Sequence, residues 1–522
     1  MKKFHIFHHR YAHGGRLELC ALGMLAALAL PPLYIFPLAF LAFGYLLVIH
    51  DKAQTARAAF WQGWWFGFGF FIAGLYWISF ALLIDVVRFG WLIPFAIFGI
   101  SGVLALYIGL VTLLLFYTRS KGLLKITLFA CIWSLAEIAR GYLFTGFPWN
   151  LMGYSWAFSD SMLQVTSIIG IWGLSFLSVW GFSTAYHFFA QKRYDTLLIA
   201  VALFIVIAGA GFLRVQDAPF VNESDVYVRV VQPNIDQSTK WDNSKIWEHM
   251  QTFRALSSLP SKAPITHLIW PESALPFPIN GKSIVIDEVL SELVPENGAF
   301  ISGVMRATVS QQCKASECAI DQLYNSMLVL DDQGKRQFYD KSHLVPFGEY
   351  IPFREWLSYP VAKITHGSID FSEGEGTVSM NLPGIGLFSP LICYEVIFPE
   401  AVVDQTNRPK LMINVTNDAW YGYSSGPFQH LVMAKVRSVE QGIPIIRAAN
   451  TGISAVYDAY GRLIKETQLS KTAVMDSRLP IALETKTTYA ELGLEGILLI
   501  ILAIFCICLF QNRKNRDSMP LS

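Results

Sequence analysis

The residues of this sequence best suited to covalent chemistry are a glutamate, a lysine and a cysteine, each of which follows a strand-like segment. Glu272 stands in the run LIWPES, Lys341 in YDKS and Cys393 in LICYE. A thiol has an ordinary pKa of about 8.5 and attacks as its thiolate, so a cysteine nucleophile needs a base or a positive charge beside it. The three residue types together therefore indicate nucleophilic catalysis by Cys393.

Each of these residues has a catalytic interpretation and a plainer one. Glu272 can take the thiol proton and return it to a leaving group. Lys341 can stabilise an oxyanion, while Glu349 and Glu395 orient the lysine and tune its pKa. Taken singly, a cysteine at a strand end is more often a packed core thiol, and a glutamate or lysine there is usually solvated. Their order and context favour the catalytic interpretation.

Strands and helices alternate over residues 214–488, and this alternation is typical of an α/β domain. Strands are predicted at 226–233, 266–270, 299–304, 324–330, 386–392, 411–416, 445–449 and 453–458, and helices at 242–257, 283–294, 398–405 and 428–442. Cys393 then lies on a turn between a strand and the helix at 398–405. The N-terminus of that helix is expected to favour the anionic form of the thiol.

The rest of the chain is too apolar for a soluble protein. Of the 522 residues, 53% are hydrophobic and 15% are charged, whereas soluble domains carry roughly 25% charged residues. A spanning helix needs about 20 apolar residues, and we predict about eight spans. The candidates are 17–30, 33–49, 60–84, 91–117, 122–140, 166–190, 196–213 and 492–510, with a tight hairpin at Pro31-Pro32 between the two short first segments.

Lysine and arginine gather in alternate short loops, which sets the orientation of the spans. Both termini are expected in the cytoplasm, with a multi-pass membrane bundle at 1–213. The candidate catalytic domain at 214–488 is expected on the exported side of the membrane, before a final span and cytoplasmic tail at 489–522. A cleaved signal peptide is the alternative for the N-terminus, but further spans follow at once, which favours an uncleaved anchor. The net charge of +1 argues against a nucleic-acid partner.

Glu137 and Arg140 interrupt one apolar segment and can pair on one helix face. Ionisable groups at membrane depth are costly, which makes them functional candidates. The alternative is a structural pair near the interface. The run TGFPWN at 145–150 follows, and it is either an interfacial aromatic belt or the lip of an active site.

The cysteines and histidines show no metal-ligand spacing. The sequence holds seven cysteines, of which Cys313 and Cys318 lie in a polar loop. In an oxidising compartment these two are expected to close a small disulfide, with two free thiols as the alternative. His343 and His430 have no partner at metal-ligand spacing and are interpreted as structural or polar-contact residues.

Longer motifs surround the three candidate catalytic residues. They are PE at 271–272, KSHLVPFGE at 341–349, CYE at 393–395, WSLAEIAR at 133–140, QPNI at 232–235, KW at 240–241, NDAW at 417–420 and RAANTG at 447–452. The first three resemble the nitrilase, or carbon–nitrogen hydrolase, superfamily and its Glu-Lys-Cys triad. The whole chain, from the membrane motif at 133–140 to the final span, is similar to the apolipoprotein N-acyltransferase family.

This resemblance implies a nitrilase-like α-β-β-α sandwich inserted before the last span of a helical membrane bundle. It implies acyl transfer from a phospholipid such as phosphatidylethanolamine to the N-terminal diacylglyceryl-cysteine of an apolipoprotein, the last step of lipoprotein maturation. The implied order is ping-pong through a thioester on Cys393, with Glu272 as general base and Lys341 as stabiliser of the intermediate. The supporting positions are Glu349, Tyr394 and Glu395, and the substrate-binding positions are Trp241, Trp420 and Asn417. No cofactor or metal is implied, and we expect a monomer.

Two alternatives stay open. A membrane-anchored hydrolase would use the same acyl-enzyme with water as the acceptor, but a soluble amide substrate would not need so many spans. A non-catalytic receptor or transporter with a degenerate enzyme domain would normally have lost a triad residue, and all three are present.

An aromatic loop around Tyr359, Trp420 and Tyr421 either enters the membrane interface or simply packs against the protein.

Overall fold

The computed structural model describes residues 15–216, 218, 225–275, 277–279, 286–309, 320–352, 354 and 369–517. The predicted disulfide residues Cys313 and Cys318 and the loop residue Tyr359 lie outside the described residues. The chain divides into two compact units, which are described separately below. The first comprises Met1–Ser79, Trp91–Asp217 and Thr487–Ser522, and the second comprises Phe80–Gly90 and Ala218–Lys486.

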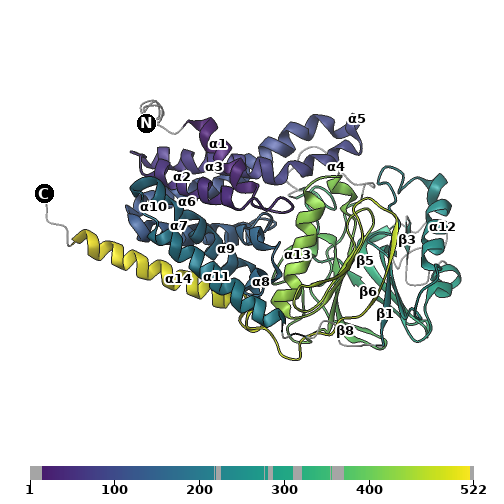
Figure 1. The fold of residues 1–522 in the computed structure, drawn as a ribbon. Helices are drawn as coiled ribbons and strands as arrows, with labels where there is room; N and C mark the ends of the chain where they lie inside the picture. Colours follow the sequence, from purple (N-terminus) through teal and green to yellow (C-terminus); the bar gives the residue numbers. More distant parts are fainter. Residues whose placement is uncertain are drawn as a thin grey trace. The chain divides into compact units, whose positions relative to one another are not determined.

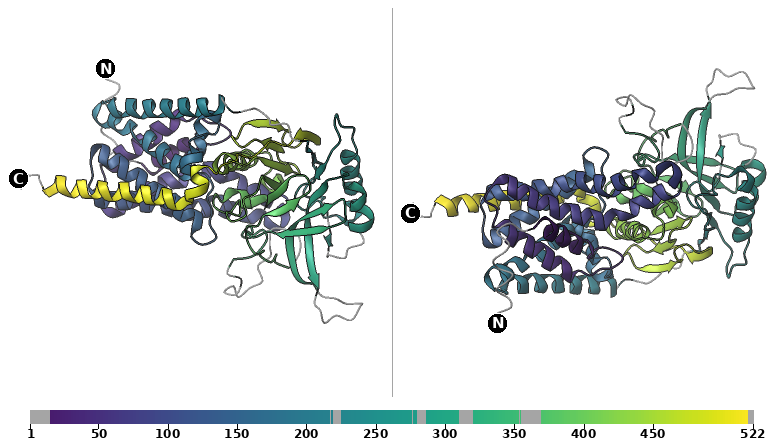
Figure 2. Two further views of the ribbon diagram at one scale, coloured as in Figure 1. Left: turned by 90° about the horizontal axis from the view of Figure 1, so that it is seen from below. Right: turned by 90° about the horizontal axis from the view of Figure 1, so that it is seen from above.

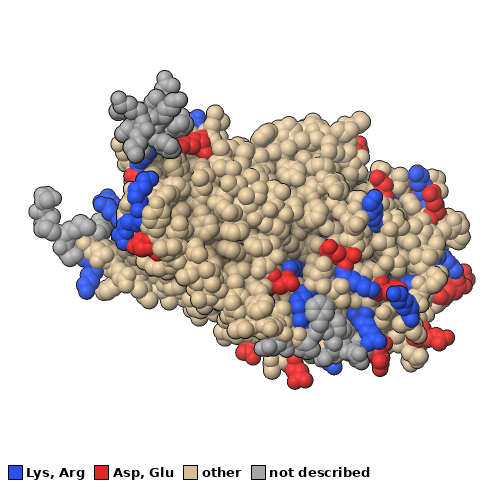
Figure 3. Space-filling view, in the orientation of Figure 1, with Lys and Arg blue, Asp and Glu red and all other residues tan. Residues whose placement is uncertain are grey.

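The first unit is built from apolar helices (Figure 1). They are α1 (Arg16–Ala27), α2 (Pro37–His50), α3 (Ala56–Leu75), α6 (Ile100–Thr118), α7 (Gly122–Tyr142), α8 (Asp160–Leu163), α9 (Thr166–Ser183), α10 (Ala185–Gln191), α11 (Asp195–Gln216) and α14 (Thr488–Asp517). On the face drawn in Figure 3, much of this unit shows no charged side chains, and Lys and Arg gather at one of its ends. That surface fits a protein embedded in lipid.

Six helical stretches among the described residues are long and apolar enough to cross a membrane. They are Ala56–Leu83, Val86–Thr118, Gly122–Tyr142, Thr166–Gln191, Asp195–Gln216 and Thr488–Asn515. The first two predicted spans correspond to α1 and α2, whose 12 and 14 residues fall short of the roughly 20 that a span needs. The predicted count of about eight is therefore not confirmed.

Glycines let α1 and α3 approach each other backbone to backbone. A Cβ atom on Gly23 of α1 would lie 1.9 Å from the carbonyl oxygen of Phe66, and one on Gly69 of α3 would lie 1.9 Å from that of Cys20. Any side chain at either position would force the helices apart. Small residues at such contacts are characteristic of membrane helices, because lipid tails leave close packing as a main source of their attraction.

The second unit is a sandwich of two mixed sheets (Figures 1 and 2). One sheet has the order β13-β1-β2-β4-β5-β6 with β3 beside β4, and the other has the order β12-β11-β10-β9-β8-β7. The strands are β1 (Tyr227–Gln232), β2 (His267–Ile269), β3 (Pro278–Ile279), β4 (Ala299–Val309), β5 (Ile320–Asp331), β6 (Arg336–Asp340), β7 (Met380–Leu382), β8 (Gly386–Ile392), β9 (Leu411–Thr416), β10 (Ile445–Ala449), β11 (Ala455–Tyr457), β12 (Leu463–Glu466) and β13 (Ala473–Arg478). Parallel strands form the middle of each sheet, β1-β2-β4 in the first and β8-β9-β10 in the second. Binding sites of α/β proteins usually lie at the carboxyl ends of such strands.

Two apolar layers stabilise the sandwich. One lies between the sheets and takes buried side chains from both, among them Val230 of β1 and Ile413 of β9. In the other, α12 (Ile246–Ser257) packs on the first sheet through Phe253, which stacks on Trp270 with ring centroids 4.3 Å apart. The second helix, α13 (Gly426–Gln441), contacts β10, and Figure 1 shows α12 and α13 on opposite sides of the strands. The layers follow the predicted α-β-β-α order.

The predicted helix at 398–405 is wrong. After β8, residues Cys393–Ile397 form a single 3₁₀ turn, η9, and Phe398 already has extended backbone angles of φ −89° and ψ 105°. The ring of Pro399 explains this ending, because a proline disfavours helical geometry in the residue before it. The described part of the predicted helix at 283–294 consists only of two short turns, Ile286–Leu290 and Ser291–Leu293.

Candidate active site

Glu272 is positioned by the turn that follows β2. The next residue, Ser273, has a left-handed backbone conformation with φ +48°. β4 passes so close to this turn that a Cβ atom on Gly303 would lie 2.4 Å from the Cα of Glu272, so only glycine fits there. Two backbone hydrogen bonds join Gly303 to the turn, one to the carbonyl of Pro271 at 3.1 Å and one from the N–H of Ala274 at 2.8 Å. The Glu272 side chain is therefore buried on a rigid support.

Asn325 of β5 and Lys341 join two buried carboxylates. Asn325 Nδ2 donates to Glu272 Oε1 at 2.8 Å and to Glu349 Oε1 at 2.7 Å. Lys341 Nζ donates to Glu349 Oε1 at 2.9 Å and lies 3.7 Å from Glu272 Oε1. Although burial alone would lower the pKa of Lys341, the two carboxylates raise it above its ordinary value. Lys341 is thus a stable cation, held mainly by Glu349.

Cys393 is buried where β8 ends and η9 begins. Its φ of +50° is uncommon for a residue with a side chain. Burial and the nearby Glu272 raise the pKa of the Cys393 thiol to about 12, while Lys341 opposes the shift. The expectation that a helix N-terminus favours the thiolate is therefore wrong, and the resting side chain is a neutral thiol.

A buried network supports the backbone of Cys393. Its carbonyl oxygen lies 3.1 Å from His430 Nε2 and 3.4 Å from Asn414 Nδ2. His430 Nδ1 lies 2.9 Å from Asp418 Oδ1, and Arg447 donates to Asp418 Oδ2 at 2.7 Å. A left-handed residue costs about 1–3 kcal/mol and persists where its surroundings fix it. This network supplies that support, so His430 is a polar-contact residue, as predicted.

We expect Asp418→Asn to lower the free energy of unfolding by about 3–5 kcal/mol, because it leaves Arg447 buried without its counter-charge. Although burial alone would raise the pKa of Asp418, Arg447 and His430 lower it to about 2 from an ordinary 3.8. A carboxyl whose folded pKa is depressed contributes stability above its ordinary pKa and loses it as the pH falls toward the folded value. The melting temperature of the variant should therefore lie below that of the unaltered protein at neutral pH. The difference should shrink in acid. An unchanged melting temperature at neutral pH would contradict this account.

Glu395 acts on the backbone around the site rather than on Lys341. One carboxylate oxygen accepts from the hydroxyl of Tyr339 at 2.6 Å and from the N–H of Ser342 at 2.7 Å. The other accepts from the N–H of Ile392 at 2.7 Å. Glu395 thus links the end of β6 to the end of β8. Lys341 follows β6 and Cys393 follows β8. This corrects the expectation that Glu395 orients Lys341 directly.

Two tyrosines lie close to Cys393 in sequence or in space. Tyr394 is buried and packs edge-on against Phe398 with ring centroids 5.2 Å apart. Tyr421 packs edge-on against His430 at 5.7 Å. Burial and the neighbouring Cys393 raise the pKa of Tyr421 well above its ordinary value, so its hydroxyl stays protonated.

The predicted substrate-binding residues are of two kinds. Trp241 and Trp420 are half-buried. Asn417 is buried, its Nδ2 donates to Gln237 Oε1 at 2.7 Å, and its Oδ1 accepts from Asn450 at 3.1 Å. Asn417 therefore holds the loop that carries Gln237. Through this contact, Asn417 would act on the site indirectly.

An apolar segment between α3 and α6 belongs to the second unit. It holds α4 (Phe80–Leu83) and α5 (Val86–Phe89), and it exposes Val86 and Val87. Its Phe80 packs on the turn after η10 (Asp418–Tyr421), where Gly422 has φ +58° and a Cβ atom would lie 2.3 Å from Phe80 Cδ1. The sequence pattern assigned residues 80–84 to a span and residues 85–90 to the loop that follows it, and it did not predict the contact.

Glu137 and Arg140 of α7 hold the loop that contains TGFPWN, within the first unit. Arg140 donates to the carbonyl oxygens of Phe147 at 2.5 Å and Trp149 at 2.7 Å. Glu137 accepts from the N–H of Met152 at 3.2 Å and from a serine hydroxyl of α9. These contacts favour the structural interpretation of the two residues.

We accordingly expect Glu137→Gln to lower the free energy of unfolding by about 1–3 kcal/mol, since it removes one carboxyl oxygen that accepts a buried hydrogen bond. The catalytic rate per folded molecule should stay unchanged. Tryptophan fluorescence during heating in detergent, combined with an activity assay at a temperature where both proteins are folded, separates the two effects. Lost activity with an unchanged melting temperature would instead assign Glu137 a direct functional role.

Sequence reasoning missed two polar groups beside Glu272. Asn325 bridges the two carboxylates, and Lys240 donates to the backbone carbonyl of Glu272 at 3.1 Å. Asn325 had a weak signal, since it is a polar residue inside the strand run LYNSMLVL. Lys240 stands beside Trp241 in the KW motif, but nothing in the sequence indicated that its side chain is buried.

Comparisons with known proteins cover both parts of the chain. Residues 22–184 match the family model described as apolipoprotein N-acyltransferase N-terminal domain, and residues 227–489 match carbon-nitrogen hydrolase. Proteins named apolipoprotein N-acyltransferase are similar over almost their whole length. One from Rickettsia prowazekii (strain Madrid E) is 38% identical over 490 residues, 93% of this chain and 96% of the relative. Another from Rhodopseudomonas palustris (strain ATCC BAA-98 / CGA009) is 35% identical over 510 residues, 94% of each. The chain therefore belongs to the apolipoprotein N-acyltransferase family.

Proposed function

We propose that the protein transfers an acyl chain from a membrane phospholipid to the α-amine of a lipoprotein's N-terminal diacylglyceryl-cysteine. The observation that carries this proposal is the buried Cys393, electrostatically coupled to Glu272 and Lys341, in a chain whose described residues include six potential spanning helices. The coupling supports a Glu-Lys-Cys triad, and the helices support substrates that reside in the bilayer. The names of the relatives support the same reaction.

The first half-reaction moves the acyl chain to the enzyme. Glu272 takes the thiol proton as the Cys393 sulfur attacks the ester carbonyl, and the ammonium of Lys341 stabilises the oxyanion. When the carbon–oxygen bond breaks, Glu272 returns the proton to the departing oxygen. A lysophospholipid leaves, and the acyl chain remains as a thioester on Cys393.

The second half-reaction passes the acyl chain to the acceptor. The lipoprotein amine attacks the thioester carbonyl, Glu272 takes a proton from the nitrogen, and the oxyanion again faces Lys341. The carbon–sulfur bond then breaks and the sulfur regains a proton from Glu272. Ester, thioester and amide form a sequence that needs no nucleotide, and we propose no cofactor.

The raised pKa of Cys393 shapes the first step. A thiol with a pKa of about 12 is almost entirely protonated at neutral pH, so a preformed thiolate is too rare to carry the reaction. Proton removal must accompany sulfur attack, which makes the rate depend on a base within reach. A neutral resting thiol also favours the approach of an apolar acyl chain, because it leaves no anion to desolvate.

Other residues complete the proposed site. Glu349 holds Lys341, Tyr394 and Glu395 support the turn at Cys393, and Trp241 and Trp420 line the path of the acyl chains. Asn417 supports this lining through its contact with Gln237. Since both substrates are lipids, we place the site near the outer leaflet of the inner membrane, with the catalytic domain in the periplasm and both termini in the cytoplasm. We propose that the protein acts as a monomer.

Product analysis with a diacylglyceryl peptide tests transfer against hydrolysis, the second candidate reaction. The full chain in detergent is mixed with phosphatidylethanolamine and the peptide, and the products are separated by mass spectrometry. The proposal predicts an N-acylated peptide and a lysophospholipid in equal amounts. Free fatty acid with an unmodified peptide would assign the same acyl-enzyme to a hydrolase.

A further inference from the structure

A second lysine is buried beside the proposed general base. Lys240 is 4% exposed, and its Nζ donates at 3.1 Å to the backbone carbonyl oxygen of Glu272. The same nitrogen lies 5.7 Å from the ring centroid of Trp241. In the described part of the chain, none of the ion pairs within 4.0 Å includes Lys240. A buried ammonium whose described hydrogen bond goes to a neutral carbonyl is costly, so its presence at this site requires a physical reason.

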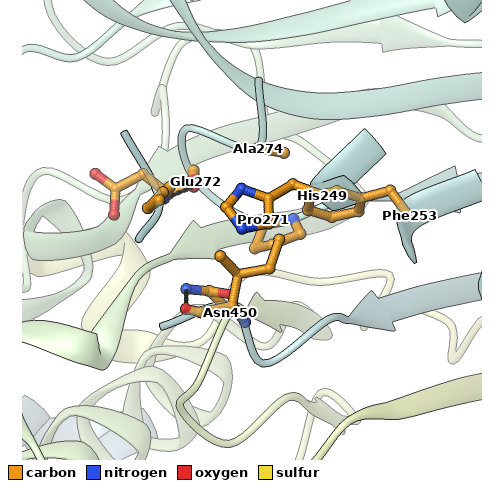
Figure 4. A pocket seen from close by; sticks show the side chains of 8 residues that line it. His249, Phe253, Pro271, Glu272, Ala274 and Asn450 are labelled. Atoms are coloured by element: carbon orange, nitrogen blue, oxygen red, sulfur yellow. Dashed lines mark hydrogen bonds between the residues drawn. The ribbon is translucent and has the colours of Figure 1, made fainter. Parts of the chain in front are cut away.

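Lys240 also lines a small cavity on the main-chain side of Glu272. Its lining also includes Glu272 and, from α12, His249 and Phe253. Figure 4 shows the Glu272 carboxylate pointing away from the rings of His249 and Phe253. The cavity thus lies behind the base rather than in front of it.

The charges of the cluster give a reason for the second lysine. Glu272 and Glu349 are both in ion-pair distance of Lys341, at 3.7 Å and 2.9 Å, so two carboxylates share one ammonium. The third buried carboxylate, Glu395, is satisfied by hydroxyl and N–H donors instead. Lys240 supplies the charge that brings the group of two glutamates and two lysines to neutrality. An oxyanion forming in this group then meets no net negative charge.

We propose that Lys240 is a positioning residue for the reaction, which fixes the turn that carries Glu272 and balances the charge of the Glu272–Glu349–Lys341 cluster. This inference rests on the proposed role of Glu272 as the base. It assigns Lys240 an electrostatic task that a neutral side chain of the same length cannot perform.

The titration of Lys240 makes this task measurable. Burial lowers the pKa of Lys240 to about 8, while Glu272 and Cys393 oppose the shift. His249 of α12 is the other titratable side chain that interacts with it. The ammonium is therefore present below pH 8 and lost as the pH rises through that value. Acylation of Cys393 should decline over the same interval.

The test is the rate at which the full-length protein in detergent gains an acyl chain on Cys393, measured by intact mass across the pH range around 8. Phosphatidylglycerol serves as the donor, because it has no head-group amine that titrates there. Lys240→Met should acylate about 10- to 100-fold more slowly and should lose the alkaline decline. Lys240→Arg should stay within a few-fold of the unaltered protein and remain active above pH 8, since a guanidinium keeps its charge. The matched control is Lys262→Met, an exposed lysine.

Two results would overturn the inference: a Lys240→Met variant with unaltered rate and pH profile, or a folded Lys240→Arg variant as slow as Lys240→Met. If Lys240→Met does not fold, the pH profile of Lys240→Arg is the deciding measurement. A decline in the acylation rate near pH 8 that persists in Lys240→Arg cannot come from Lys240 and would overturn the inference. The proposed function fails separately, when the unaltered protein forms no thioester on Cys393 at any pH. A thioester that forms normally in both Lys240 variants removes only the role of Lys240.

Discussion

Cys393→Ala should abolish acyl transfer, with a fall in rate on the order of 10⁴-fold or more, because the sulfur is the atom that carries the acyl chain. The variant should fold, since removing one buried sulfur leaves a cavity that costs on the order of 1 kcal/mol. The measurement is lysophospholipid release from phosphatidylethanolamine, beside the melting temperature of each protein. Cys393→Ser tests the chemistry more finely, because a hydroxyl fits the site but ionises far less readily than a thiol.

The matched control is Cys506→Ala, which removes an exposed free thiol on α14. It should leave both transfer and melting unchanged. Turnover that survives in Cys393→Ala would show that another residue is the nucleophile. The same loss of activity in both variants would point to an effect on lipid or detergent association rather than on chemistry.

Glu272→Gln should slow acyl-enzyme formation by about 10²- to 10⁴-fold, the usual contribution of a general base. The glutamine oxygen can still accept the hydrogen bond that Asn325 donates at 2.8 Å, so the local structure should survive. What is lost is the group that takes the proton from a thiol whose pKa is about 12. The residual rate should rise with pH, because hydroxide then produces more thiolate.

Glu248→Gln is the control for this substitution, since Glu248 is exposed on α12. It should acylate at the normal rate. An unaltered rate in Glu272→Gln would exclude Glu272 as the base, and a flat dependence of its residual rate on pH would exclude the neutral thiol as the resting state. Single-turnover mass spectrometry reports acylation alone and avoids confusion with the second half-reaction.

The positions of Glu272 and Cys393 after strands could be predicted because they follow from local patterns. Glu272 and Cys393 each follow an apolar, β-branched run, and those runs form β2 and β8. Since strands of one sandwich end near each other, residues far apart in sequence come together there. The long apolar segments were equally clear, and six of them have helices of spanning length.

The parts that sequence could not predict depend on contacts between distant segments. The burial of Lys240 and the bridging position of Asn325 arise only when β2, β5 and the loop after β1 meet. The 3₁₀ turn after β8 ends for a local reason, because Pro399 disfavours helical geometry in Phe398. The left-handed turn at Cys393 is set by the network of His430 and its partners, which no spacing pattern indicated.

The most direct test of the account is to trap the acyl-enzyme and locate its acyl chain. The full-length protein is incubated with phosphatidylethanolamine without an acceptor, digested, and its peptides are analysed by mass spectrometry. The account predicts a mass gain of one acyl chain on the peptide that contains Cys393, discharged when a diacylglyceryl peptide is added and recovered as its N-acyl product. An acyl chain on another residue, or none with a lipid that supports turnover, would contradict a cysteine-based acyl transfer.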